Sequence, residues 1–226
     1  MKTIDLIVDM AEGDPWDDDL IALCSSAAIC CGGHAGSPEL ARETAARCRA
    51  REVRVIAHPG YPDRAGKGRE EMDLADDSAG ADLLQELTKQ VACVPQAKGI
   101  KLHGALYHQA GKSQAHASVL TALLMRTGLP LIGWGEGRHP SSARAAGVSF
   151  FAEGFADRRL NEGGSMVSRM EPNAMLSNPD EIKESVLKLA PLCSSLCIHG
   201  DTPGCVEIAQ IVRRSLMEEG WRIAAP

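Results

Sequence analysis

The chain has 226 residues, of which 44% are hydrophobic and 4% aromatic, so it can bury one sizeable and mostly aliphatic core. A formal net charge of −6 at pH 7, with no dense basic cluster, argues against a nucleic-acid or anionic-membrane partner. The opening residues MKTIDLIVDM lack a secretory pattern, and no apolar run is long enough to span a membrane.

Short apolar runs alternate with amphipathic stretches along the chain. The runs predict strands over residues 4–10, 27–31, 53–59, 100–107, 129–135, 148–155 and 195–201. The stretches predict helices over residues 39–52, 78–94, 113–128, 141–147, 181–190 and 202–220. Ser37-Pro38 and Asn178-Pro179 are start signals, and Thr202 is expected to cap the last helix with Pro203 at its first position.

This alternation indicates an α/β fold with a mostly parallel sheet covered by helices. An open doubly wound sheet and a closed barrel both fit the pattern. No internal repeat or linker divides the sequence, so residues 1–226 are expected to form a single domain.

The eight cysteines lie in apolar settings such as ALCSSAAICC, and no CxxC pair occurs. Together with the missing secretory pattern, this favours reduced, buried thiols in a cytoplasmic protein over a disulfide framework. The adjacent residues Cys30 and Cys31 leave a redox role open.

Titratable residues gather at the predicted strand ends. Four of the seven histidines follow strands beside glycine or proline, in GGHAG, AHPG, LHGA and IHGD. The carboxyl ends of parallel strands share one face, so these imidazoles and the neighbouring carboxylates should converge there. Each residue alone could be a satisfied core or capping residue. The whole set predicts an active site, because burying so many titratable groups is costly unless they serve one another or a ligand.

Local motifs restrict the chemistry further. HxxxH and HExxH are missing, so no metal ligands are assigned, although distant residues such as Asp9, His34 and His58 could still assemble a metal site. The sequence has no GxxxxGK[ST] phosphate loop and no GxSxG nucleophile motif. The basic loop GKGRE (66–70) could meet an anion through Lys67 or Arg69, or could simply be solvated.

Seven sequence blocks occur in a distinctive order: DMAEG (9–13), CCGGHAG (30–36), AHPGYPD (57–63), GKGREEMDL (66–74), KLHGALY (101–107), FADRRLNEGGSMVSR (155–169) and HGDTPG (199–204). In these blocks the chain resembles the LamB/YcsF family from Asp5 to about Gly220. The resemblance implies an irregular seven-stranded (β/α) TIM-like barrel, similar to the polysaccharide deacetylase/glycoside hydrolase superfamily.

The resemblance also implies a function, that of the A subunit of an ATP-dependent 5-oxoprolinase. Such an enzyme opens the lactam 5-oxoproline to L-glutamate and uses ATP, with Mg, together with two partner subunits, named B and C. The lack of a phosphate loop in this chain agrees with that division of labour. Self-association into a homo-oligomer stays open, as does a bound metal.

The family's polar positions supply the predicted site. The expected catalytic residues are Asp9, Glu12, Lys101, His103, His199 and Asp201. The expected substrate-binding residues are His34, His58, Tyr107, Asp157, Arg158 and Arg169.

Water would attack the lactam or its phosphorylated form. Asp9 or Glu12 is the expected general base, because a strand-end carboxylate in a closed pocket can have its pKa raised. His103 or His199 would protonate the leaving nitrogen, and Lys101 would stabilise the oxyanion. Arg158 or Arg169 would bind the substrate carboxylate. The variant Asp9→Asn is expected to lose turnover and keep its fold.

The residues that lead into the first block depart from the family pattern, because Ile7 stands where asparagine is usual. We expect this change to remove a hydrogen-bonding group from the pocket. Two alternatives therefore stay open. One is a metal-dependent amide hydrolase or deacetylase acting on another lactam or amide, and the other is a divergent ligand-binding protein without catalysis.

Overall fold

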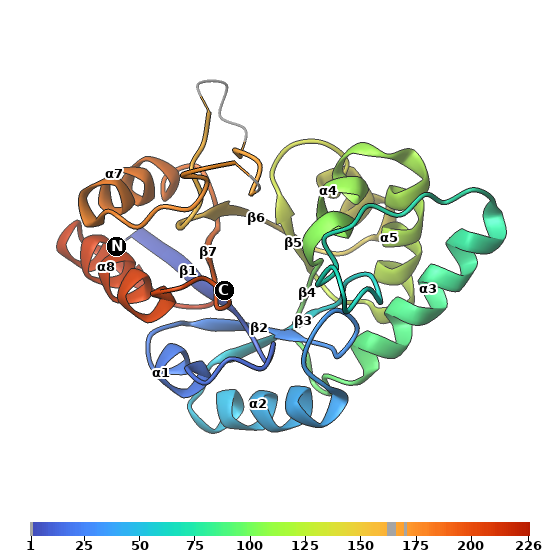
Figure 1. Ribbon diagram of the computed structural model, residues 1–226, viewed down its shortest axis with the longest axis horizontal. Coiled ribbons are helices and arrows are strands. Elements are labelled where there is room, and N and C mark those ends of the chain that lie inside the picture. Colours follow the sequence, from blue (N-terminus) through green and yellow to red (C-terminus); the bar gives the residue numbers. More distant parts are fainter. Residues whose placement is uncertain (1, 162–165, 170) are drawn as a thin grey trace.

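Seven parallel strands close into a barrel in the computed structural model, which describes residues 2–161, 166–169 and 171–226 (Figure 1). The strands are β1 (Lys2–Met10), β2 (Ser26–Cys30), β3 (Arg54–His58), β4 (Ile100–Lys101), β5 (Leu131–Trp134), β6 (Phe150–Phe155) and β7 (Ser195–His199). Neighbours in sequence pair in order, and β1 closes the ring by pairing with both β7 and β2. The barrel expectation is confirmed. Residues 162–165, within one of the sequence blocks, lie outside the described residues.

Helices surround the strands on the outside of the barrel, as Figure 1 shows. They are α1 (Asp17–Ile21), α2 (Pro38–Ala50), α3 (Asp77–Ala92), α4 (Gly104–Lys112), α5 (Gln114–Thr127), α6 (His139–Ala146), α7 (Pro179–Leu189) and α8 (Cys205–Glu218). The Ser37 side chain caps α2 by accepting the N–H of Leu40, and Asn178 caps α7 in the same way. Both predicted start signals are confirmed.

The fourth predicted strand is wrong beyond Lys101. At His103 the chain turns, its N–H donates to the carbonyl of Pro59, and α4 starts at Gly104 with φ +57°. The segment HGALY is therefore the first turns of a helix, and α4 was missed, as was the short helix α1. A short apolar run fits a buried helix as well as a strand, so its periodicity does not separate the two.

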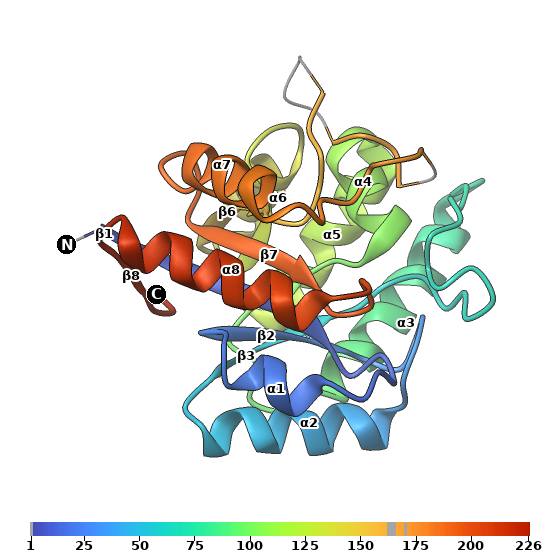
Figure 2. The same ribbon diagram turned by 60° about the vertical axis from the view of Figure 1, so that its left-hand side comes forward.

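The start of α8 also differs from the prediction. Gly204, with φ +77°, precedes the helix, and neither Thr202 nor Pro203 belongs to it. The Thr202 hydroxyl instead lies 3.4 Å from an oxygen of Asp157, where it helps to hold the site described below. An eighth strand, β8 (Trp221–Ile223), was not predicted. It pairs in parallel with Lys2–Ile4, outside the barrel (Figure 2).

The barrel interior is arranged in layers, because alternate residues of a strand point to the same face. At the amino end, Asp5 accepts hydrogen bonds from Ser25 and Ser26. The next layer is apolar and consists of Ile7, Ala28, Ile56 and Ile132, all at most 1% exposed. The layer at the carboxyl end contains the polar residues of the site.

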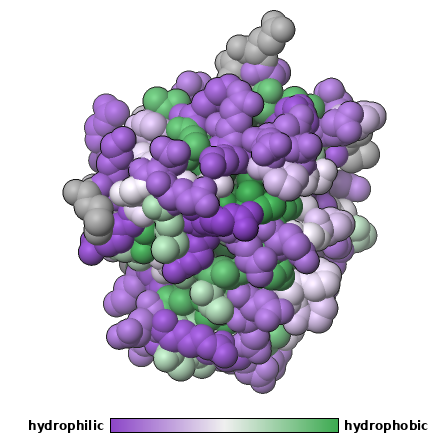
Figure 3. All heavy atoms as spheres, turned by 90° about the vertical axis from the view of Figure 1, so that its left-hand side faces the viewer, coloured by the Kyte–Doolittle hydropathy of each residue, from purple (hydrophilic) through white to green (hydrophobic). Residues whose placement is uncertain are grey.

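The surface and the cysteines agree with the composition. Within the described residues, the molecule has no helix of the length and apolarity that crossing a membrane requires. The face shown in Figure 3 is mainly hydrophilic, with small hydrophobic areas. All eight cysteines are free and six of them are buried, as expected for thiols in apolar settings.

Candidate active site

A cavity of about 430 Å³ opens where the strands end. The predicted residues that line it are Asp9, His58, Lys101, His103, Tyr107, Arg158, Arg169 and His199. The other four lie directly behind this lining: Glu12 and His34 contact His103, Asp157 contacts His199, and Asp201 contacts Arg169. The structure therefore brings all twelve predicted residues together. A second hollow, between α3 and α5, is lined by none of them.

Lys101 and Asp9 form a buried ion pair at the centre of the site. The Lys101 Nζ lies 2.7 and 2.9 Å from the two Asp9 oxygens, and both side chains are at most 3% exposed. Burial alone would raise the pKa of Asp9, but His58 and Lys101 together hold it well below the usual range. The expectation of a raised pKa at Asp9 is therefore wrong, because its carboxylate is already neutralised by the ammonium group.

Glu153, which was not predicted from the sequence, is a carboxyl group beside Lys101 whose pKa is raised. It lies on β6, 3.9 Å from the Lys101 ammonium, and its side chain is fully buried. Burial raises the pKa of Glu153 to about 7, and neither oxygen has a hydrogen-bond partner in the described part of the chain. A single carboxylate within the apolar strand FFAEGF was the available signal, since alternate residues of that strand face the interior.

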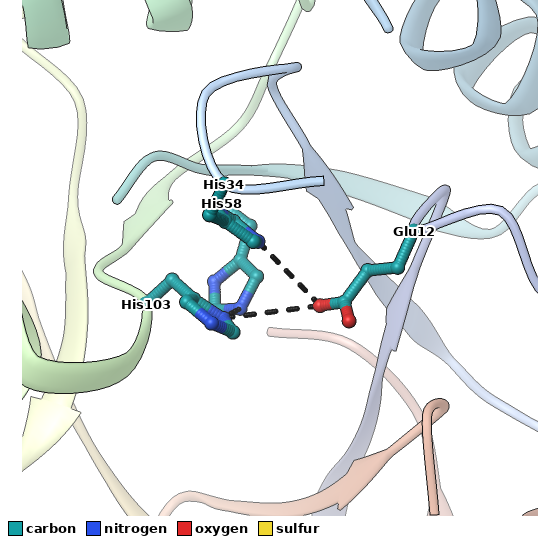
Figure 4. Close-up of side chains that lie close together, drawn as sticks. All are labelled: Glu12, His34, His58 and His103. Carbon is teal, nitrogen blue, oxygen red and sulfur yellow. Dashed lines mark hydrogen bonds and ion pairs between the residues drawn. The ribbon is translucent and has the colours of Figure 1, made fainter. Parts of the chain in front are cut away.

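Three histidines and Glu12 form a compact cluster, which we call the imidazole cluster (Figure 4). The rings of His34 and His103 are stacked with centroids 3.6 Å apart, and His58 stands edge-on to both. Glu12 Oε1 lies 3.5 Å from His34 Nε2 and 3.8 Å from His103 Nδ1. Burial lowers the pKa of His58 and His103, whereas neighbouring Cys30 and Glu12 outweigh burial at His34 and raise its pKa to about 9.

Glycines let the backbone approach this cluster closely. Gly68 has φ +67°, and a Cβ there would lie 2.8 Å from the Cβ of His34. A Cβ at Gly60 would lie 2.9 Å from His34 Nδ1. The loop around Gly68 consequently lies against the imidazoles, and the carbonyl of Lys67 reaches His103 Nε2 at 3.0 Å.

His199 is oriented by Asp157. Its Nδ1 lies 2.9 and 3.0 Å from the two carboxylate oxygens, and its backbone N–H donates to the same carboxylate. Burial would raise the pKa of Asp157, but His199 and Arg169 lower it overall, so it remains ionised. A carboxylate only accepts hydrogen bonds, so Nδ1 carries the hydrogen and Nε2 is left to act on a ligand.

Arginines form the outer wall of the cavity. Arg69 and Arg169 both pair with Asp201, and Arg169 also contacts the Thr202 hydroxyl at 3.2 Å. Asp201 therefore acts as an anchor for two cations. Arg158 donates to the carbonyl of Val167, and its Nε has no partner within the described segments. Burial and the nearby Arg169 lower the pKa of Arg158, so an anion at this wall would be favourable.

Ile7 does not line the cavity. It belongs to the apolar layer beneath Asp9, where it packs with Ala28 and Ile56. The expected loss of a pocket hydrogen bond is therefore wrong for this structure, since the side chain two residues before Asp9 points the same way but one layer deeper.

The chain is similar to known proteins over almost its full length. The LamB/YcsF family model matches residues 4–226. The chain is 34% identical to the A subunit of 5-oxoprolinase from Neisseria meningitidis serogroup C over 100% of both sequences. It is 36% identical to the protein of the same name from Histophilus somni over 97% of both. The crystal structure of a lactam utilization protein from Thermus thermophilus superposes with a TM-score of 0.87 at 29% identity, covering both chains completely.

We predict that stability depends on pH through Glu153. Between pH 4.5 and about 7 the folded protein holds a proton that the unfolded chain has released, so stability falls as pH rises through this range. The shift corresponds to about 3 kcal/mol. When unfolding in urea is measured at pH 5 and at pH 8, the free energy of unfolding of Glu153→Gln minus that of wild type should rise by about that amount. The exposed control Glu184→Gln should follow the wild-type curve, and parallel curves for both variants would contradict the assignment.

We also predict strong coupling between Asp9 and Lys101. Lys101→Met or Asp9→Asn leaves one buried charge without its partner and should lower the free energy of unfolding by about 3–5 kcal/mol. The loss of unfolding free energy in the double variant should be smaller than the sum of the two single losses, by at least about 2 kcal/mol. Unfolding of all four proteins in urea measures this coupling. The exposed pair Arg159–Glu181 is the control, with coupling below about 1 kcal/mol. Additive losses at Asp9 and Lys101 would refute the idea.

Proposed function

This chain belongs to the LamB/YcsF family, and we propose that it is the A subunit of an ATP-dependent 5-oxoprolinase that opens the lactam 5-oxoproline to L-glutamate. Full-length relatives are named as A subunits of 5-oxoprolinase and as a lactam utilization protein. The proposal rests on one cavity, which is lined by the Asp157-oriented imidazole of His199, the buried ammonium group of Lys101 and three arginines.

In this proposal the enzyme uses ATP, with Mg, together with the B and C partner subunits. The chain has no phosphate loop of its own, so ATP use is assigned to the assembled enzyme. A reducing, cytoplasmic setting is part of the same proposal and is supported by the burial of six thiols.

The arginine wall is the proposed site for the substrate carboxylate. Arg158 and Arg169 line the cavity, and Asp201 holds Arg169 in place. A guanidinium group binds a carboxylate through two parallel hydrogen bonds, which fixes orientation as well as adding affinity. A lactam bound in this way would place its ring in the cavity, toward Lys101 and His199.

Hydrolysis forms a C–O bond from water to the lactam carbonyl carbon and breaks the ring C–N bond, while the nitrogen gains a proton. Because Asp9 is neutralised by Lys101, we assign the proton transfers to His199 Nε2 instead. His199 would take a proton from water and return it to the nitrogen, and Asp157 would stabilise the intermediate imidazolium. The Lys101 ammonium would stabilise the charge that develops on the carbonyl oxygen.

The first test of this proposal is glutamate release from 5-oxoproline with Mg-ATP. Glutamate should form only when this chain, ATP and both partner subunits are all present. The control replaces this chain with a relative that is active with the same partners. No glutamate from this chain beside an active control would reject the proposed substrate or a catalytic role.

The second test concerns the proton carrier. Asp157→Asn removes the carboxylate that orients His199 and should lower kcat about 10²- to 10⁴-fold. Asp201→Asn loosens Arg169 and should act mainly on KM for 5-oxoproline. Steady-state kinetics with the complete enzyme separate the two effects. Unchanged kcat in a folded Asp157→Asn variant would exclude His199 as the proton carrier.

A further inference from the structure

We propose that the imidazole cluster, Glu12, His34, His58 and His103, binds one divalent first-row transition-metal ion of the Zn²⁺ type. One ligand atom from each residue lies within 4.8 Å of the others. The four residues come from loops or strand ends after β1, β2, β3 and β4, and the three imidazoles are at most 5% exposed. This proposal goes beyond the lactam hydrolysis argued above, which uses none of these residues.

The hydrogen bonds of two rings leave their lone pairs facing each other. His58 Nδ1 lies 2.8 Å from the carbonyl of Lys101, and His103 Nε2 lies 3.0 Å from the carbonyl of Lys67. A carbonyl only accepts, so both of these nitrogens carry hydrogen. In neutral rings, His58 Nε2 and His103 Nδ1 then carry lone pairs, and these two atoms are only 3.0 Å apart. A shared proton, which makes this contact a hydrogen bond, or a metal ion bound to both nitrogens removes this repulsion.

The carbonyl contacts are themselves typical of metal ligands. A metal-bound histidine almost always donates its other N–H to a carbonyl or a carboxylate, which fixes its tautomer and its ring plane. His58 and His103 both have this arrangement. The third ring, that of the buried His34, makes no hydrogen bond among the described residues, and its Nε2 faces Glu12 Oε1 at 3.5 Å.

The spacing of the ligand atoms suits a small ion. Tetrahedral zinc with bonds of about 2.0–2.1 Å keeps its ligand atoms roughly 3.3 Å apart. The observed separations are 3.0 Å between His58 and His103, 3.5 Å between His34 and Glu12, and 3.8 Å between His103 and Glu12. Figure 4 shows Glu12 pointing toward the imidazoles from the opposite side. Because the His34 and His103 rings are stacked, the His34 ring would have to turn about its side-chain bonds before both lone pairs point at one ion.

Charge also favours a cation in the imidazole cluster. Two carboxylates adjoin it: Glu12 Oε1 lies 3.8 Å from His103 Nδ1, and Asp9, although it pairs with Lys101, has an oxygen 3.4 Å from His58 Nε2. The second candidate set, Asp9, Cys197 and His199, is less suitable, because Lys101 holds both Asp9 oxygens and Asp157 holds His199 Nδ1. Three imidazoles with one carboxylate favour Zn²⁺, Co²⁺ or Ni²⁺ over Mg²⁺.

His58 and His103 also line the cavity, so the ion would adjoin a ligand bound there. An ion in that place can polarise a carbonyl oxygen or lower the pKa of a bound water. The binding itself does not depend on which ligand the cavity accepts.

Metal titration of chelator-treated protein tests this directly. Calorimetry with Zn²⁺ should give one ion per chain, Co²⁺ should give visible absorption of a low-symmetry complex, and Mg²⁺ should bind far more weakly. Glu12→Gln should weaken Zn²⁺ binding by at least about tenfold, and His34→Asn by about 100-fold. His108→Asn is the matched control, since His108 lines the same cavity outside the imidazole cluster, and its Zn²⁺ affinity should not change.

Two results would overturn the proposal: no stoichiometric Zn²⁺ or Co²⁺ binding by the folded wild-type protein, or equal affinity in wild type and a folded Glu12→Gln variant. Glu12→Gln keeps the side-chain shape, so it covers the case in which His34→Asn does not fold. Because the readout is metal binding, a negative glutamate assay leaves this inference unaffected, and a negative titration leaves the proposed lactam activity unaffected.

Discussion

A buried ammonium group is the constraint on which this site depends. Lys101 is 2% exposed, and its charge is tolerated only because Asp9 meets it with both oxygens. This pairing links β4 to β1 across the barrel interior. It also decides the roles of the surrounding groups, because Asp9 is held ionised while Glu153, farther from the ammonium group, keeps a pKa near neutrality. These two carboxyl groups thus differ in protonation because His58 and Lys101 both lower the pKa of Asp9, whereas burial outweighs Lys101 at Glu153.

The polar layer divides into two parts around this ion pair. On one side Asp157 orients His199, which lines the cavity together with Arg158 and Arg169. On the other side the imidazole cluster is enclosed by a glycine loop and ordered by two backbone carbonyls. The apolar layer of Ile7 and Ile56 lies beneath both parts and separates them from the amino end of the barrel. Water therefore reaches the polar layer from the carboxyl-end face, where the cavity opens.

The gathering of site residues could be predicted from sequence because parallel strands bring their ends to one face whatever the loops between them. Which of those residues pair with each other could not be predicted from the sequence. Asp9 and Lys101 are 92 positions apart, and only the barrel register shows that they meet. Glu153 was not predicted as a site residue because a single carboxylate in an apolar strand belongs to no local sequence motif. The run after Lys101 was misassigned because a short buried helix and a buried strand have similar compositions. Ile7 was wrongly placed in the pocket because its layer depends on the alternation of side chains along the strand, counted from Asp9.

The pairing of β8 with the first residues of β1 brings both chain ends to the amino end of the barrel. Ala224 donates to the carbonyl of Ile4, so the two ends of the polypeptide are neighbours, on the side of the molecule opposite the cavity. A purification tag or fused protein at either end would leave the mouth of the cavity clear for large molecules to approach. A short peptide could also join the two ends and allow new termini to be cut in a surface loop, so that the barrel could be circularly permuted without rebuilding its interior.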